Sequence, residues 1–157
     1  MNAPQTLARD GIAALIPHSG SMCLLARLRA WDTQRIVCTA TNHRDGDHPL
    51  RTRRGLLAPV AIEYAAQAMA LHGALIGQAT GTPATPGYLA SARGVQLNVL
   101  RLDDLAAPID HADELQVEAT RQAGDTRQIL YAFSVHHAGR LLVEGRAAVV
   151  LNTALIA

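Results

Sequence analysis

One segment restricts the possible folds more than any other: the apolar stretch from Val60 to Ala79, VAIEYAAQAMALHGALIGQA. Alanine is the best helix former, and twenty helical residues extend over about 30 Å. Apolar residues occur nearly all the way round this helix, so other elements must cover most of its sides. The segment has about membrane-spanning length, but Glu63, Gln67 and His72 make a core helix the better interpretation.

Strand-like segments lie on both sides of this helix. Before it, residues 23–31 and 35–41 have the pattern of two strands joined by a short turn. After it, apolar residues recur at every second position, which is the period of a strand with one buried face. The alternating residues are Val95, Leu97 and Val99, then Leu115, Val117 and Ala119, then Ile129, Tyr131, Phe133 and Val135. A last long strand is expected over residues 141–151.

This order of elements predicts the fold class. Strands on both sides of a single helix indicate an α+β protein with an antiparallel sheet. A sheet that covers so apolar a helix has to curl around it, as in the hot-dog fold. We therefore expect an antiparallel curved sheet wrapped around one long central helix. The length of 157 residues suits a single domain over residues 1–157.

The composition excludes several classes of protein. Only 17% of the residues are charged and 49% are hydrophobic, which excludes a disordered chain. A net charge of +1 attracts neither nucleic acid nor a membrane surface, and 3% aromatic residues argue against stacking on bases. The first residues lack the pattern of a secretion signal, and Cys23 and Cys38 form no CxxC motif. We therefore expect a cytoplasmic protein with two reduced thiols.

Glu63 is the one carboxylate of the apolar helix. Burial disfavours its charged form, whereas a position in the first helical turn favours it. A carboxyl group under these opposing influences suits general acid–base catalysis, although a glutamate at this place can also simply cap the helix. Gln67 follows four residues later on the same face, where it can hydrogen-bond Glu63 or a ligand.

Four of the seven histidines have contexts that predict no catalytic role. His72 lies on the helix and is expected to be a core or interface residue. His111, His136 and His137 lie near turns or strand ends and are expected to be solvated. No histidine or cysteine pair has the spacing of a zinc site, so we expect no metal.

The other three histidines lie in loops ahead of the helix. His18 belongs to the segment IPHSGSM, and His43 and His48 belong to a polar stretch over residues 42–55 that has no periodicity. A structureless loop of that length in a compact domain is uncommon and is usually functional or mobile. Loop positions near the carboxylate of Glu63 make these three histidines the candidates for catalysis.

The basic residues are all arginine, and four of them lie within residues 44–54. The planar guanidinium group binds phosphate and carboxylate through parallel hydrogen bonds. Arg53 and Arg54 precede the helix and are therefore candidates for binding an anionic substrate group. A solvated, mobile loop is the alternative.

Several phrases of the sequence resemble one superfamily of enzymes. Ile16-Pro17-His18 leading into Met22 to Leu25 is similar to the opening of bacterial 3-hydroxyacyl dehydratases of fatty-acid synthesis, and the string from Val60 to Ala68 is similar to their central-helix motif. The phrases IPHSGSM, NHRDGDHPLR, IEYAAQAMALHGAL and GYLASARGVQLNVLRLDDL resemble a branch of it, the ApeP-like dehydratases of aryl polyene and xanthomonadin-type pigment synthesis. The resemblance covers residues 11–152, nearly the whole chain.

The resemblance implies removal of water from a 3-hydroxyacyl chain to give the trans-2-enoyl thioester. The chain would be carried on the phosphopantetheine arm of an acyl carrier protein, and no further cofactor is implied. In such enzymes a histidine takes the proton from C2, the helix acid assists departure of the hydroxyl group, and backbone N–H groups at the helix start polarise the carbonyl. The candidates are Glu63, His18 and His48 for catalysis, and Gln67, Arg53 and Arg54 for binding the substrate and its acidic carrier.

The resemblance also implies a homodimer or heterodimer with catalytic residues from opposite subunits, and we expect the long strand over residues 88–101 at the seam. One departure from the fatty-acid enzymes leaves alternatives open. Their catalytic histidine lies in His-Phe-Pro-Gly, fourteen residues before the acid, where this chain has Pro49. His48 takes that role if the loop has one extra residue; otherwise it is incidental. The alternatives are a catalytically silent or site-sharing partner of an active dehydratase and, less favoured, a hot-dog thioesterase.

Overall fold

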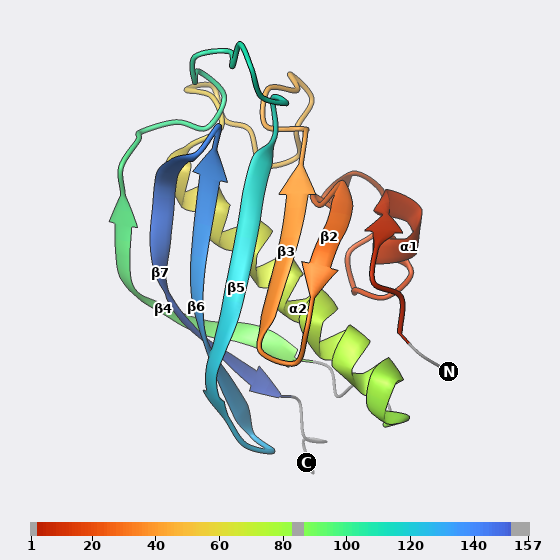
Figure 1. Cartoon of the computed structure of the whole chain (residues 1–157). Coiled ribbons are helices and arrows are strands. Elements are labelled where there is room, and N and C mark those ends of the chain that lie inside the picture. Colours follow the sequence, from red (N-terminus) through yellow and green to blue (C-terminus); the bar gives the residue numbers. More distant parts are fainter. Residues whose placement is uncertain (1–2, 83–86, 152–157) are drawn as a thin grey trace.

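The structure is a computed structural model that describes residues 3–82 and 87–151. Its antiparallel sheet curves around one long helix, α2 (Ala61–Thr80), which crosses one face of the sheet (Figure 1). This is the arrangement that the sequence predicts, so the expected α+β class and hot-dog fold are confirmed.

The sheet has seven strands in the order β1-β2-β3-β5-β6-β7-β4, so β1 and β4 form its edges. The elements besides α2 are β1 (Leu7–Ala8), α1 (Arg9–Ala13), η1 (Gly20–Met22), β2 (Arg27–Trp31), β3 (Arg35–Ala40), η2 (Ala58–Val60), β4 (Gly87–Leu97), β5 (Leu115–Gly124), β6 (Gln128–His137) and β7 (Arg140–Leu151). The strand expected from residue 23 therefore begins at Arg27, and the one expected over residues 88–101 ends at Leu97.

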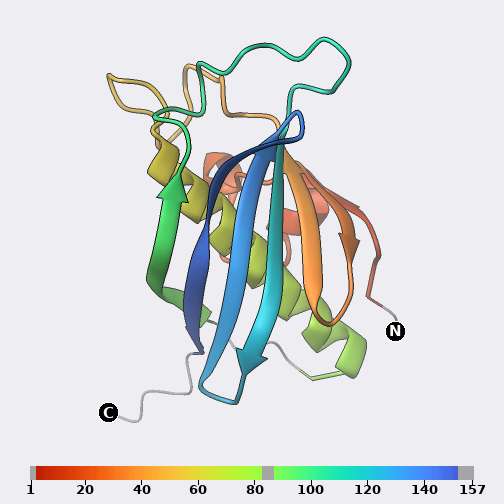
Figure 2. The same ribbon diagram turned by 60° about the vertical axis from the view of Figure 1, so that its left-hand side comes forward.

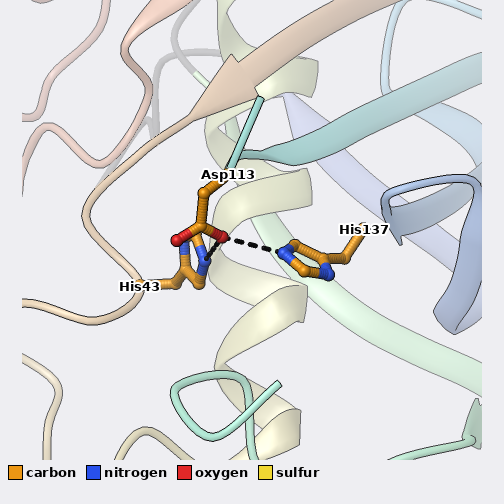
Figure 3. Close-up of side chains that lie close together, drawn as sticks. All are labelled: His43, Asp113 and His137. Atoms are coloured by element: carbon orange, nitrogen blue, oxygen red, sulfur yellow. Dashed lines mark hydrogen bonds and ion pairs between the residues drawn. The ribbon is translucent and has the colours of Figure 1, made fainter. Parts of the chain in front are cut away.

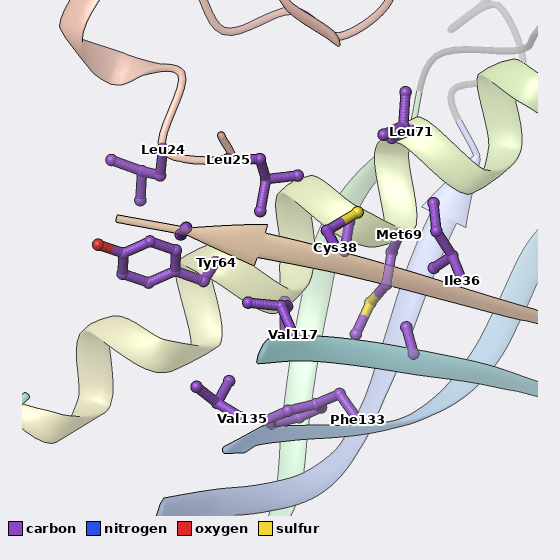
Figure 4. Packing of buried hydrophobic residues seen from close by; sticks show 14 of the residues in the cluster. Leu24, Leu25, Ile36, Cys38, Tyr64, Met69, Leu71, Val117, Phe133 and Val135 are labelled. Atoms are coloured by element: carbon purple, nitrogen blue, oxygen red, sulfur yellow. The ribbon is translucent and has the colours of Figure 1, made fainter. Parts of the chain in front are cut away.

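Alternating residues of β5 and β6 fill the space between sheet and helix. Val117, Phe133 and Val135 lie in one buried cluster with Tyr64 and Met69 of α2 (Figure 4). The residues between them on each strand face away from the helix. The period-two pattern in the sequence thus identifies the buried face of the sheet.

The two ends of α2 have separate local causes. A short 3₁₀ turn, η2, precedes the helix, and Pro59 suits such a first turn because its missing N–H would have no helical partner there. At the other end Gly81 has a φ of 69°, a left-handed conformation that glycine adopts without a steric penalty. Its N–H donates to the Gln78 carbonyl and that of Thr82 to the Gly77 carbonyl, which closes the helix.

One stripe of α2 is not covered by the sheet. Most residues of the helix are buried, but Ile62, Glu63, Ala66, Ala70, Gly73 and Ile76 are only half-buried. Positions three or four residues apart share one helix face, so these six form a continuous stripe. Glu63 lies in the first turn of α2, and the loops before α2 and before β5 lie near this end of the helix (Figure 2).

The polar loop over residues 42–55 is more ordered than the sequence suggests. Asn42, His43 and His48 are buried, and successive turns are closed by backbone hydrogen bonds such as that from the His48 N–H to the Asp45 carbonyl. The stretch forms no helix or strand, as the lack of periodicity predicts, but its turns and buried side chains give it a defined path. Its polar side chains hydrogen-bond inside the protein, which a pattern of hydrophobicity cannot reveal.

Candidate active site

Glu63 and His18 come together at the N-terminal end of α2. Glu63 lies in the first turn of the helix, and His18 lies in the segment between α1 and η1. The Nε2 atom of His18 is 3.2 Å from Oε1 of Glu63, and the two side chains are 29% and 34% exposed. Two of the predicted catalytic residues thus form a pair within a single chain, with access from solvent.

Gln67 hydrogen-bonds both the carboxylate of Glu63 and the backbone of the neighbouring segment at Met22 and Leu24. Its Nε2 donates to Glu63 Oε1 at 3.2 Å and to the Met22 carbonyl at 2.8 Å, and its Oε1 accepts the Leu24 N–H at 2.8 Å. The side chain is fully buried. The expected hydrogen bond to Glu63 is present, and it makes Gln67 a positioning residue. A direct contact with substrate stays a prediction.

His48 lies in a different hydrogen-bond chain. Its Nδ1 accepts the Leu50 N–H at 3.0 Å, so the ring proton is on Nε2, which donates to the Tyr64 hydroxyl at 3.0 Å. The Tyr64 hydroxyl in turn donates to Asn42 Oδ1 at 2.6 Å. Burial lowers the pKa of His48, which keeps the imidazole neutral. With both ring nitrogens engaged, His48 anchors the loop to α2, and the described residues show no contact between it and Glu63.

Arg53 and Arg54 lie on an exposed turn just ahead of η2. The turn is closed between Thr52 and Gly55, and the Arg54 N–H donates to Thr52 Oγ1. Neither guanidinium has an ion-pair partner among residues 3–82 and 87–151. Arg51, by contrast, pairs with Asp103 at 3.0 Å. The two predicted binding residues are thus free to meet an anion, and that role stays a prediction.

Asp113 is the centre of a second polar cluster (Figure 3). Its Oδ1 lies 3.1 Å from His43 Nε2 and 2.9 Å from His137 Nε2, and Arg44 Nε donates to its Oδ2 at 2.6 Å. The hydrogen bonds from Arg44 and then from the two imidazoles hold the pKa of Asp113 far below its ordinary value. His137 is buried, so the expectation that it is solvated is wrong.

Two imidazoles and a carboxylate are also side chains that bind transition metals, and their ligand atoms lie within 4.8 Å of one another. In this cluster, however, the carboxylate of Asp113 already accepts hydrogen bonds from both imidazoles and from Arg44. The arrangement acts as a clamp that joins the loop after β3, the loop before β5 and the end of β6. That the protein binds no metal stays a prediction.

An apolar groove of about 340 Å³ is lined by residues that neighbour His18 and Glu63 in the chain. Its walls include Ile16 and Pro17, then Ala66, Ala70 and Gly73 of α2, and Leu89, Ile129 and Val149 of the sheet. None of the described residues that line it is charged. Pro17 directly precedes His18, and Ala66 lies one helical turn after Glu63. The groove therefore leads away from the two polar side chains, along the uncovered stripe of α2.

The backbone N–H groups at the start of α2 already donate hydrogen bonds within the protein. The Ala58 N–H donates to the Leu100 carbonyl, and the Val60 N–H donates to the Leu57 carbonyl. The next amides bond to the Ala58 and Pro59 carbonyls. The backbone N–H groups that the resemblance implies for polarising a carbonyl are thus occupied by η2.

The comparison with protein families gives a match over residues 11–155 to the model described as ApeP-like, ApeP dehydratase. No curated protein matches the chain. None of the helices in the described ranges has the length and apolar character that crossing a membrane requires.

Solved structures share the fold at low sequence identity. One chain of the dehydratase heterocomplex ApeI:P from Xenorhabdus doucetiae is 22% identical, with a TM-score of 0.75 and coverage of 92% of this chain and 91% of that one. A candidate thioesterase from Shewanella oneidensis is 14% identical, with a TM-score of 0.60 and coverage of 91% and 93%. At these identities the likeness shows a shared hot-dog architecture, which dehydratases and thioesterases both use.

Proposed function

The chain belongs to the ApeP-like dehydratase family, and from this premise we propose that it converts a 3-hydroxyacyl thioester into the trans-2-enoyl thioester and water. We take the acyl group to be carried on the phosphopantetheine arm of an acyl carrier protein, in the synthesis of polyene pigments or similar fatty-acid-like products. The reaction exchanges no electrons with another molecule, so it needs no redox cofactor. Such carrier-bound synthesis takes place in the cytoplasm, where we place the protein.

One observation carries the proposal: His18 and Glu63 form a pair, and residues close to them in the chain, Pro17 and Ala66, line an apolar groove. The reaction needs one group that accepts a proton and one that donates a proton, a few ångströms apart, beside a site for an apolar chain. Both His18 and Gln67 approach Oε1 of Glu63, whereas Oε2 has no partner within the described ranges. That oxygen is available to the 3-hydroxyl group of a substrate.

In the proposed reaction the neutral imidazole of His18 takes the proton from C2, and the electron pair of that C–H bond forms the C2–C3 double bond. The C3–O bond breaks, and the carboxyl group of Glu63 donates the proton with which the hydroxyl group leaves as water. His18 is then protonated and Glu63 is ionised. Because their Nε2 and Oε1 atoms are 3.2 Å apart, the proton returns from His18 to Oε1 of Glu63, and half a turn of the carboxyl group then presents it to the next substrate. The pair thus starts each cycle in the same state.

A second hot-dog subunit is the partner that we propose besides the carrier. β4 forms one edge of the sheet over eleven residues, and Tyr88, Leu97 and Leu100 near it are exposed large apolar side chains. The similar chain from Xenorhabdus doucetiae comes from a dehydratase heterocomplex. A chain that lends Glu63 to a site with a histidine from its partner is the second candidate function, because His-Phe-Pro-Gly is missing here.

The deciding experiment incubates the purified protein, alone and with any copurifying subunit, with a 3-hydroxyacyl group on a carrier protein. Mass spectrometry of the carrier distinguishes three outcomes. Loss of one water from the acyl group supports dehydration, and release of the free acid identifies a thioesterase instead. Activity in the mixture only, retained when His18 is replaced by alanine, identifies the site-sharing role.

A further inference from the structure

Gly73 leaves a gap in the wall of the groove. It lies on the same face of α2 as Glu63, Ala66 and Ala70, and a Cβ placed on Gly73 would meet no atom within 4 Å. Glycine inside a helix costs roughly 0.5–1 kcal/mol relative to alanine. Gly73 is not among the residues with positive φ, so its backbone does not require glycine. Neither packing nor backbone conformation therefore requires glycine at this position, which opens onto free space in the groove.

The space continues beyond Gly73. Gly73 follows Glu63 by ten positions, which corresponds to about 15 Å along the helix axis. A second hollow of about 380 Å³, lined by Gly77 and Gln78 among others, shares Ala14, Leu15 and Ala74 with the groove. Among the described residues, no side chain closes the groove at Gly73, so an apolar chain bound in the groove can continue into the second hollow.

We propose, on the basis of the dehydratase function above, that Gly73 determines the length of acyl chain that the site accepts. An extended long chain runs along the uncovered stripe of α2 and passes over Gly73, whereas a short chain ends near Ala66 and never reaches it. Each methylene group that the groove buries strengthens binding by about fourfold. The absence of a side chain at Gly73 thus strengthens the binding of long acyl chains and leaves that of short chains unchanged.

The test measures binding, so that it does not depend on the chemical step. The probes are butanoyl and hexadecanoyl pantetheine thioesters without a 3-hydroxyl group, titrated into the protein as purified. Gly73→Leu is expected to weaken binding of the hexadecanoyl probe by about tenfold or more, because several methylene groups lose their site. Binding of the butanoyl probe is expected to stay unchanged.

Two matched variants control for effects on the helix. Gly73→Ala adds one methyl group in free space, so both probes are expected to bind as to wild type while the melting temperature rises. Ala79→Leu adds the same side chain to the exposed last turn of α2 and is expected to change neither affinity. If Gly73→Leu does not fold, Gly73→Met replaces it, since methionine adapts to irregular space.

The inference is wrong if the Leu variant weakens both probes equally or leaves the hexadecanoyl affinity unchanged. A failure of the proposed function has a different signature. In that case the chain-length effect on binding persists, but wild type forms no enoyl product from either 3-hydroxyacyl chain. Dehydration with unaltered chain-length preference in Gly73→Leu contradicts the inference alone.

Discussion

The Nε2 atom of His18 lies 3.2 Å from Oε1 of Glu63, and both residues belong to one chain. Gln67 binds the same carboxylate oxygen from the next turn of α2. The three side chains to which the proposed reaction assigns proton transfer and positioning therefore contact one another within a single chain.

Replacing Glu63 by glutamine is expected to abolish most dehydration. The amide keeps the size and most hydrogen bonds of the side chain but cannot exchange a proton, and loss of a general acid typically lowers kcat by about 10²–10⁴-fold. Enoyl formation on the carrier measures this loss. Asp110→Asn, which removes the charge of an exposed carboxylate instead, serves as the control and should turn over at the wild-type rate. Equal rates for Glu63→Gln and wild type would remove Glu63 from the mechanism.

His18 and His48 are expected to respond differently to alanine substitution. His18→Ala should lose activity with little change in stability, because its side chain is partly exposed. His48→Ala removes the hydrogen bond that the Tyr64 hydroxyl accepts, leaves the Leu50 N–H without its acceptor, and should destabilise the fold by about 1–3 kcal/mol. Activity per folded molecule should remain. Urea unfolding combined with the dehydration assay separates the two effects, and an inactive but stable His48→Ala protein contradicts this assignment.

Stability is expected to fall as the pH drops below about 6.5, the ordinary pKa of histidine. Burial lowers the pKa values of His43, His48 and His72, so the folded state resists protonation that the unfolded state accepts. Their stabilisation is complete above the unfolded pKa and is lost as the pH falls through the lower folded values. Asp103, with a pKa of about 2, stays ionised over this range and adds nothing to the change. A melting temperature that is constant down to a pH of about 5 contradicts this prediction.

A charge at the free edge of the sheet is expected to disrupt the oligomer. Leu97 is 46% exposed at the end of β4, and Leu97→Arg should lower both the mass measured by light scattering and the dehydration rate. Leu130→Arg is the control, because Leu130 is similarly exposed but lies on β6 within the sheet. A wild-type monomer with full activity would show that no partner is needed.

Removing Arg53 and Arg54 together is expected to slow association with the carrier protein. Acyl carrier proteins are acidic, and both guanidinium groups are exposed just ahead of the site helix. The double alanine variant should raise the KM for carrier-bound substrate at low ionic strength, and the difference should shrink as salt is added. The control is a second double variant, Arg27→Ala with Arg127→Ala, which makes the same change of net charge elsewhere on the surface. If the two double variants behave alike, the effect is one of net charge and not of docking.

The sequence predicts the parts of this structure that depend on short-range patterns. The apolar stretch after Val60 and the alternation in β5 and β6 yield the fold class, because burial on one side imposes a period on the chain. Glu63 stands out as an acid in an apolar helix. The sequence predicts a strand from residue 23, but β2 begins only at Arg27. Leu24 donates its N–H to Gln67 and therefore belongs to the candidate site and not to the sheet.

Contacts between distant loops are what the sequence does not reveal. Asp113 meets His43 from seventy residues away, and none of the three side chains around it has a distinctive spacing. The context of His48 is compatible with catalysis and with structure alike. Only the position of the Tyr64 hydroxyl, which depends on the path of the loop, shows that both nitrogens of His48 are engaged.

The place of β4 at the end of the sheet has a consequence for production of the protein in the cell. Eleven residues of backbone donors and acceptors along one side of β4 have no neighbouring strand within the described part of the chain. Such an edge pairs readily with other extended chains, including further copies of the same chain. A cell that synthesises this chain faster than the edge of β4 becomes covered would therefore accumulate aggregates, and the second subunit proposed above would protect the chain from that loss.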